Sequence, residues 1–140
     1  MSIVVDGSIA LSWVLPDESA PATQHIRERI EAGIRPLVPS HWQLEVANAL
    51  WMAERRNRIS QADTSAALAA FQKLDIETDA ETAQRAGSDT LALARQHTLS
   101  IYDAAYLELA MRRGAPLASL DGSLRNAARK LKVAVLPKAV

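Results

Sequence analysis

Residues 100–128 read SIYDAAYLELAMRRGAPLASLDGSLRNAA, and they predict a helix, a buried strand and a second helix in that order. Apolar residues recur with helical spacing from Asp103 onward. Gly114 is expected to end this helix, because a glycine just past the last turn adopts a left-handed conformation at little cost. Residues 116–120 then predict a short buried strand that ends on Asp121. Two acids therefore lie at special positions, one at a helix start and one at a strand end.

Short apolar runs alternate with helical patterns along the rest of the chain. Strands are predicted at residues 3–5, 36–39, 74–77, 116–120 and 132–136, and helices at 9–15, 20–32, 41–57, 60–73, 79–96, from 103 and from 122. This alternation is typical of an α/β protein with a parallel sheet covered by helices on both faces. We expect one domain over residues 1–140, with its site at the carboxyl ends of the strands.

The composition narrows the class of protein. The chain has no cysteine, which excludes disulfides and thiolate metal sites and is consistent with a cytoplasmic location. Its apolar N-terminus lacks a basic region and is interrupted by Asp6 and Pro16, so we expect neither a signal peptide nor a membrane span. Residues 1–110 contain fifteen acids and nine basic residues, whereas residues 111–140 contain seven basic residues and one acid. A basic end of this kind is typical either of a polyanion partner or of solvated helix faces.

Asp6 repeats the arrangement of Asp121 at the other end of the chain. Each ends a predicted strand, and each is followed by Gly-Ser and a helix. Either acid alone is explained as a helix cap that accepts backbone N–H groups. On adjacent parallel strands, however, the two would place their carboxylates at the same edge of the sheet.

Glu45 is the only charged residue between Trp42 and Ala53. A buried carboxylate without a partner is very costly, so Glu45 lies either at the rim of its helix or beside a partner. Asn48, one turn further on, would orient a carboxylate or a water on the same face. Asp103 is either the cap of its helix or a free carboxylate, because Ser100 competes for the capping position.

Four carboxylates in one crevice would raise each other's pKa, which makes a bound cation among them the expected arrangement. The three histidines, His25, His41 and His97, are far apart in sequence and are interpreted as ordinary residues. Ligation by oxygen alone favours Mg²⁺ or Mn²⁺ over Zn²⁺, and such ions promote phosphoryl transfer. We refer to Asp6, Glu45, Asp103 and Asp121 as the four acids.

The segments around the four acids resemble the PIN domain, and most closely the VapC toxins of bacterial toxin–antitoxin pairs. The matching segments are IVVDGSIALSWVL, HWQLEVANAL, SIYDAAYLELA and PLASLDGSL, in this order over nearly the whole chain. The resemblance implies a three-layer α/β/α fold and a metal-dependent endoribonuclease that acts on single strands. It also implies a homodimer and inhibition by a small antitoxin whose tail occupies the active-site groove. The four acids would be the catalytic residues and the Mg²⁺ or Mn²⁺ ligands.

Three polar residues match further positions of that family. Ser8 corresponds to a Ser or Thr near the first acid, Asn48 to a polar residue one turn after the Glu, and Ser119 to a Thr before the last Asp. A further acid that follows the last Asp in some relatives is absent, since Ser123 follows Gly122. The number of metal ions is therefore left open.

Basic side chains are the candidate contacts to RNA phosphates, where charge supplies affinity without sequence information. An arginine near the carboxylates would instead neutralise them. No motif indicates a platform for stacking bases. The tryptophans, together with Met52, are interpreted as core residues or as part of a dimer interface. The arginines considered for RNA are Arg112, Arg113, Arg125 and Arg129, with Arg55, Arg56 and Arg58 as further candidates; the tryptophans are Trp13, Trp42 and Trp51.

Two alternatives to a ribonuclease remain at this point. The first is another phosphoryl-handling hydrolase, such as a phosphatase on a doubly wound sheet. Phosphatases with an aspartyl nucleophile typically need a second Asp two residues after the first, and this chain has Ser8 there. The second is an inactive relative that binds nucleic acid or protein and whose acids only cap helices. Such a protein would not need Glu45 in its apolar setting, so the metal-dependent endoribonuclease is preferred.

Overall fold

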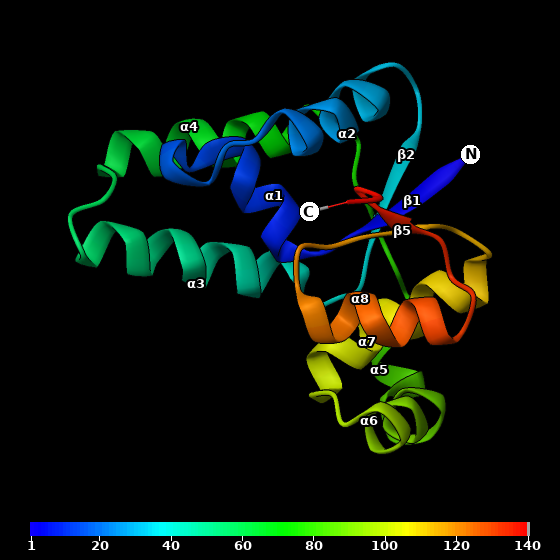
Figure 1. Ribbon diagram of the computed structural model, residues 1–140. Coiled ribbons are helices and arrows are strands. Elements are labelled where there is room, and N and C mark those ends of the chain that lie inside the picture. Colours follow the sequence, from blue (N-terminus) through cyan, green and yellow to red (C-terminus); the bar gives the residue numbers. More distant parts are fainter. Residues whose placement is uncertain (140) are drawn as a thin grey trace.

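Five short parallel strands form the centre of the computed structural model, which describes residues 1–139 (Figure 1). Their order across the sheet is β3-β2-β1-β4-β5, so the first strand of the chain is the central one. In register, Val4 lies opposite Leu37 on one side and Leu117 on the other. The strands are β1 (Ser2–Val5), β2 (Arg35–Val38), β3 (Glu77–Thr78), β4 (Leu117–Ala118) and β5 (Val135–Leu136). The predicted α/β class and the parallel sheet are confirmed.

Helices connect all five strands and cover the sheet. In Figure 1, α5 to α8 gather below the sheet, and α3 and α4 form a hairpin that extends away from it. None of the helices in the described part of the chain is long and apolar enough to cross a membrane. The helices are α1 (Gly7–Val14), α2 (Pro21–Glu31), α3 (Trp42–Arg55), α4 (Gln61–Gln72), α5 (Thr82–Arg85), α6 (Leu91–His97), α7 (Ile101–Arg113) and α8 (Gly122–Lys130), with a 3₁₀ turn η1 (Pro16–Glu18) and a π-helical turn η2 (Ala86–Thr90).

The core extends over the strands and most of the helices, and one part of it lies between the sheet and α7. The strand residues Val4, Leu37 and Leu117 are fully buried, and so are Leu107 and Leu109 of α7. This packing fixes the start of α7 relative to the carboxyl ends of β1 and β4. The core therefore positions the segments that contain Asp6, Asp103 and Asp121.

Several element boundaries differ from those predicted. The predicted strand at 74–77 begins only at Glu77, because Asp75 has a left-handed backbone with φ of 51°. The predicted helix at 79–96 starts later and is interrupted by η2. Its start is delayed because the N–H of Asp79 donates to Val38 and continues the sheet. Gly114 ends α7 as predicted, with φ of 59°. Val140, the last residue of the predicted domain, lies outside the described residues.

Candidate active site

Asp6 directly follows β1 and is almost completely buried, with 6% of its surface exposed. Its Oδ1 accepts hydrogen bonds from the hydroxyl of Ser8 at 2.6 Å and from the N–H of Ile9 at 3.2 Å, so it caps α1. Its Oδ2 accepts a hydrogen bond from the hydroxyl of Ser119 at 2.5 Å. Burial raises the pKa of Asp6 to about 6, although these hydrogen bonds oppose the shift.

The same two serines link the end of β1 to the end of β4. The Ser8 hydroxyl accepts a hydrogen bond from the N–H of Leu120, and the Ser119 hydroxyl accepts one from the N–H of Asp121. Asp121 is exposed, and its carboxylate accepts a hydrogen bond from the N–H of Leu124 at the start of α8. Asp6 and Asp121 therefore both cap helices, and capping still leaves oxygen lone pairs for other partners.

Glu45 lies in the first turn of α3, between two ring side chains. The hydroxyl of Tyr106 donates to its Oε2 at 3.2 Å, and Nε2 of His41 lies 2.9 Å from its Oε1. A Cβ added at Gly7 would lie 3.6 Å from the same Oε2, which places this carboxylate beside the first turn of α1. Glu45 is therefore held next to the segment that follows Asp6.

Asp103 lies in the first turn of α7 but does not cap it. Ser100 is the N-cap of α7, because its hydroxyl accepts a hydrogen bond from the N–H of Asp103. Burial raises the pKa of Asp103 above its usual range, and the negative charges of Asp121 and Glu45 raise it further. The charge of Asp103 in turn adds to the raised pKa of Asp6. Asp103 thus lies within the electrostatic range of all three other acids.

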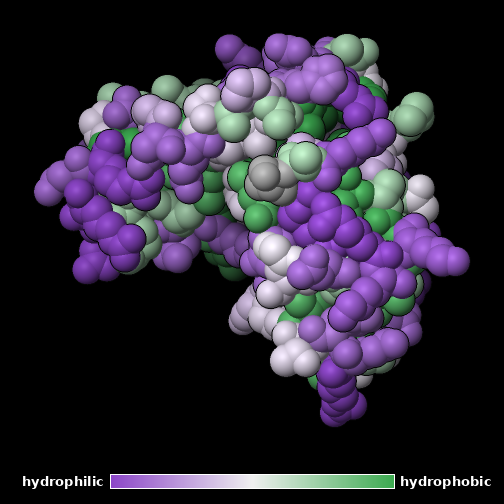
Figure 2. Space-filling view, viewed as in Figure 1, coloured by the Kyte–Doolittle hydropathy of each residue, from purple (hydrophilic) through white to green (hydrophobic). Residues whose placement is uncertain are grey.

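The four acids lie at the starts of four helices, α1, α3, α7 and α8. In Figure 1 these helix starts converge near the centre of the molecule, and Figure 2 shows an indented outline between the α3–α4 hairpin and the part formed by α5 to α8. Helix N-termini carry partial positive charge, which offsets part of the repulsion among the carboxylates. No Arg or Lys within residues 1–139 forms an ion pair with any of the four.

This donor set fits a hard divalent cation. It offers carboxylate and hydroxyl oxygens, and two of its acids, Asp6 and Asp103, have pKa values raised by burial and by neighbouring carboxylates. Among residues 1–139, no three acidic or histidine side chains are yet close enough together to hold an ion. A bound divalent cation would replace the mutual repulsion of the carboxylates by attraction to the ion.

Two residues of the site were missed in the sequence. His41 was interpreted as an ordinary residue, and Tyr106 was not considered. The signals that would have found them are local: His41 precedes Glu45 by four residues, and Tyr106 follows Asp103 by three, so each pair shares a helix face. Asn48, expected to support Glu45, is exposed, and it forms no hydrogen bond with the four acids in the described part of the chain.

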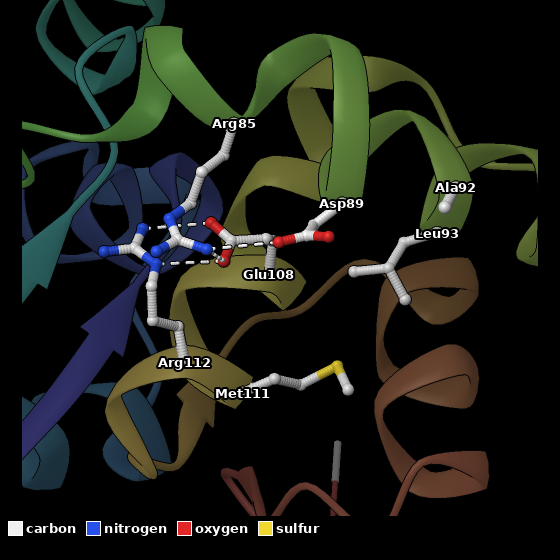
Figure 3. Close-up of a pocket in the computed structure, with 7 residues that line it drawn as sticks. All are labelled: Arg85, Asp89, Ala92, Leu93, Glu108, Met111 and Arg112. Carbon is white, nitrogen blue, oxygen red and sulfur yellow. Dashed lines mark hydrogen bonds and ion pairs between the residues drawn. The ribbon is translucent and has the colours of Figure 1, made fainter.

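Arg112, a candidate RNA contact, is only partly exposed and is paired with acidic side chains of the protein. Its guanidinium donates to Asp79 at 2.7 Å and to Glu108 at 2.9 Å, and a third pair reaches Glu81. Figure 3 shows the guanidinium groups of Arg112 and Arg85 next to the Glu108 carboxylate, in a cavity whose lining includes none of the four acids. The charges in this cavity neutralise one another, so we interpret the cluster as structural, and an RNA contact by Arg112 stays a prediction.

Arg125 also has an intramolecular role. It is buried, and its guanidinium donates to the carbonyl of Ser119 at 2.8 Å, which supports the end of β4. We therefore withdraw it as an RNA contact. Arg113 pairs with Glu77 at the surface, and Arg129 is exposed and reaches the carbonyl of Lys138. These two arginines remain accessible to a polyanion.

The tryptophans divide between core and surface. Trp13 and Trp42 are buried, and the Trp13 N–H donates to the carbonyl of Thr23, so both belong to the core. Trp51 is 53% exposed on α3, where Leu44 of the same helix is 76% exposed. Only Trp51 of the three is therefore available to an interface.

Comparisons of the sequence and of the structure with known proteins agree with one another. The model of the PIN domain family matches residues 3–130. Ribonuclease VapC3 of Pyrobaculum aerophilum is 32% identical over 142 residues, which cover 98% of this chain and all of that protein. Among solved structures, PAE2754 of P. aerophilum has a TM-score of 0.71 at 22% identity, covering 96% of this chain and 83% of that one. VapBC2 of Rickettsia felis, solved with a DNA fragment of its promoter, has a TM-score of 0.65 at 14% identity, covering 96% and 97%. These two structures share the fold.

Proposed function

This chain belongs to the PIN domain family, and on that premise we propose that it is an endoribonuclease of the VapC type that requires Mg²⁺ or Mn²⁺ at the four acids. The observation that supports this best is the convergence of four carboxylates at helix starts without an Arg or Lys partner within residues 1–139. Such an arrangement is costly unless a cation completes it. The relative that aligns over 98% of this chain, VapC3 of P. aerophilum, is also named a ribonuclease.

The side chains around the acids would prepare them for this chemistry. Ser8 and Ser119 fix both oxygens of Asp6, and Tyr106 and His41 fix those of Glu45. Asp103 and Asp121 are less constrained and are free to close on an ion. A divalent ion bound there would lower the pKa of a water and stabilise the leaving oxygen of a phosphodiester. The supporting role of Asn48 is the weakest of the set, because within residues 1–139 it forms no hydrogen bond with any of the four acids.

We further propose the partners that the VapC resemblance implies. These partners are RNA as substrate, a small antitoxin encoded beside the gene, and a second copy of this chain. We also propose that the protein acts in the cytoplasm. The solved VapBC2 complex of R. felis is one case in which a protein of this fold has a protein partner. Growth arrest on expression, relieved by co-expression of an adjacent short gene, would support the toxin role. Harmless expression would contradict it and leave the nuclease proposal intact.

The nuclease proposal is tested with Asp103→Asn, which keeps the side-chain size and removes the charge. We expect single-stranded RNA to be cleaved with Mg²⁺ or Mn²⁺ and not in EDTA. We also expect the cleavage rate of the variant to fall at least about 100-fold. Changes to residues that only hydrogen-bond to metal ligands already lower metal affinity or activity by about 10- to 100-fold. Asp75→Asn is the matched control, because Asp75 is an exposed Asp paired with Arg35 at the surface. Equal cleavage with and without EDTA would overturn the metal requirement.

A further inference from the structure

Tyr102 is an exposed aromatic residue next to the four acids. It directly precedes Asp103, and 63% of its surface is exposed. Among the large apolar side chains that are exposed within residues 1–139, only Tyr102 and Trp51 are aromatic. No hydrogen bond in this part of the chain holds the Tyr102 hydroxyl, whereas the Tyr106 hydroxyl donates to Glu45. The Tyr102 ring therefore faces solvent, and no hydrogen bond of its hydroxyl within residues 1–139 restricts its orientation.

This ring forms the outer end of an aromatic group that reaches Glu45. The ring centroids of Tyr102 and His41 are 5.5 Å apart with an interplanar angle of 59°, and those of His41 and Tyr106 are 5.3 Å apart. The inner two members both contact the Glu45 carboxylate. His41 supports one side of the Tyr102 ring, and the exposed remainder lies at the edge of the acid site.

The local charge explains why such a ring would be needed. RNA phosphates are repelled by the four acids until an ion is bound, and no Arg or Lys pairs with these acids in the described part of the chain. The positive charges of Arg112 and Arg125 are already engaged by intramolecular partners. Stacking on an aromatic ring binds single-stranded RNA without using charge, and it tolerates any base because every base has a π-face.

We propose that Tyr102 is a positioning residue on which a nucleobase of single-stranded RNA stacks, so that the adjacent phosphate lies at the four acids. This inference rests on the proposed ribonuclease function and adds to it how the substrate is held. The competing occupant of the exposed ring is a second copy of this chain. The experiment therefore measures RNA binding and oligomeric state together.

The test uses metal-free protein in EDTA, so that binding is measured without cleavage. The probes are fluorescein-labelled oligo(A) and oligo(U) of about twelve nucleotides, within the usual site sizes of single-strand binders. We expect Tyr102→Leu, which keeps apolar bulk but removes the ring, to weaken binding roughly 5- to 100-fold. Tyr102→Phe, the matched control, keeps the ring and should stay within about twofold of the wild type.

Abasic oligonucleotides of the same length should bind the wild type and Tyr102→Leu equally, because no base is left to stack. Binding of the normal probes by Tyr102→Leu at wild-type strength would overturn the inference alone. Absence of RNA binding and cleavage by the wild type would overturn the proposed function as well. A sedimentation change in Tyr102→Leu that accounts for its lost affinity would assign the ring to a dimer contact instead, and would also overturn the inference.

Discussion

Asp6 shows how a single residue combines a structural and a chemical role. Its carboxylate caps α1 and accepts hydrogen bonds from two serine hydroxyls. Burial nevertheless disfavours the charged form and raises the pKa of Asp6 to about 6. In the unfolded chain an Asp titrates near 3.9. The folded metal-free protein therefore retains a proton on Asp6 over a pH range in which the unfolded chain has lost it.

The metal-free protein should consequently become less stable as the pH rises from about 4 to about 6. Below this range both states are protonated, and above it the folded state has lost roughly 2–3 kcal/mol relative to its value at low pH. We expect Asp6→Asn to remove this component, so that the variant gains stability over the wild type as the pH rises. Urea unfolding in EDTA at several pH values measures the difference.

Added Mg²⁺ provides the control for the same residue. An ion that binds only the folded protein should stabilise the wild type above pH 6, where Asp6 is ionised, and should have little effect on Asp6→Asn. A difference in stability between wild type and variant that does not change with pH would show that Asp6 does not titrate in this range.

At this scale the sequence was most informative where a charge had no ordinary explanation. Asp6 and Asp121 share a strand-end pattern, and Glu45 interrupts an apolar helix face, so their positions were predictable. The arginines were not, because a basic residue on a helix has the same sequence signature whether it faces solvent or buried acids. Arg112 is an example: its partner Asp79 is distant in sequence and reaches it only through the fold.

At the scale of elements, the Arg112 cluster fixes α7 against the edge of the sheet. Arg112 and Glu108 belong to α7, Asp79 follows β3, Glu81 precedes α5, and Arg85 is the last residue of α5. Glu108 and Asp79 are both buried, so removal of the guanidinium would leave two buried carboxylates without the cation that pairs with both of them. The cluster therefore holds α7, whose first turn contains Asp103.

We expect Arg112→Met to lower the free energy of unfolding by about 3–5 kcal/mol, the usual result of breaking a buried ion pair from one side. Arg113→Met is the matched control. Arg113 is adjacent on the same helix, but its pair with Glu77 is at the surface, so its loss should cost less than about 1 kcal/mol. Equal effects in denaturant unfolding of the two variants would contradict a structural role for the cluster.

The elements that could be predicted were those with strong local signals. Gly114 and Ser60 ended or began helices as expected, and Ser60 forms a reciprocal capping box with Asp63. The boundaries near residues 74–98 were wrong because tertiary contacts determine them. Asp79 pairs with β2 through its backbone and with Arg112 through its side chain, and neither contact is visible in a local pattern.

For the whole molecule, Leu44 and Trp51 are a candidate surface for self-association. They are seven residues apart on α3, hence on one face of the helix, and both are exposed. We expect the protein to sediment as a dimer at micromolar concentration and Trp51→Lys to shift it to monomer. Met111→Lys is the control, since Met111 is exposed on α7 instead. A monomeric wild type, or equal effects of the two changes, would contradict this surface.

The meeting of the four acids is the property that the sequence alone left unproved. Each acid was placed at an element end by local rules, but the approach of α3 and α7 to the sheet edge depends on core packing. Strand order was open as well: the pairing of β1 with β4 was an assumption, and the structure confirms it through the opposition of Val5 and Ala118.

That pairing also bears on the order in which the protein is made. The central strand, β1, is synthesised well before one of its two neighbours, β4, and well before the acid that follows β4. Until then the nascent chain has an open sheet edge and lacks Asp121. A nuclease built in this way would be inert during its own translation, and a premature stop before residue 117 would yield a product without a complete site.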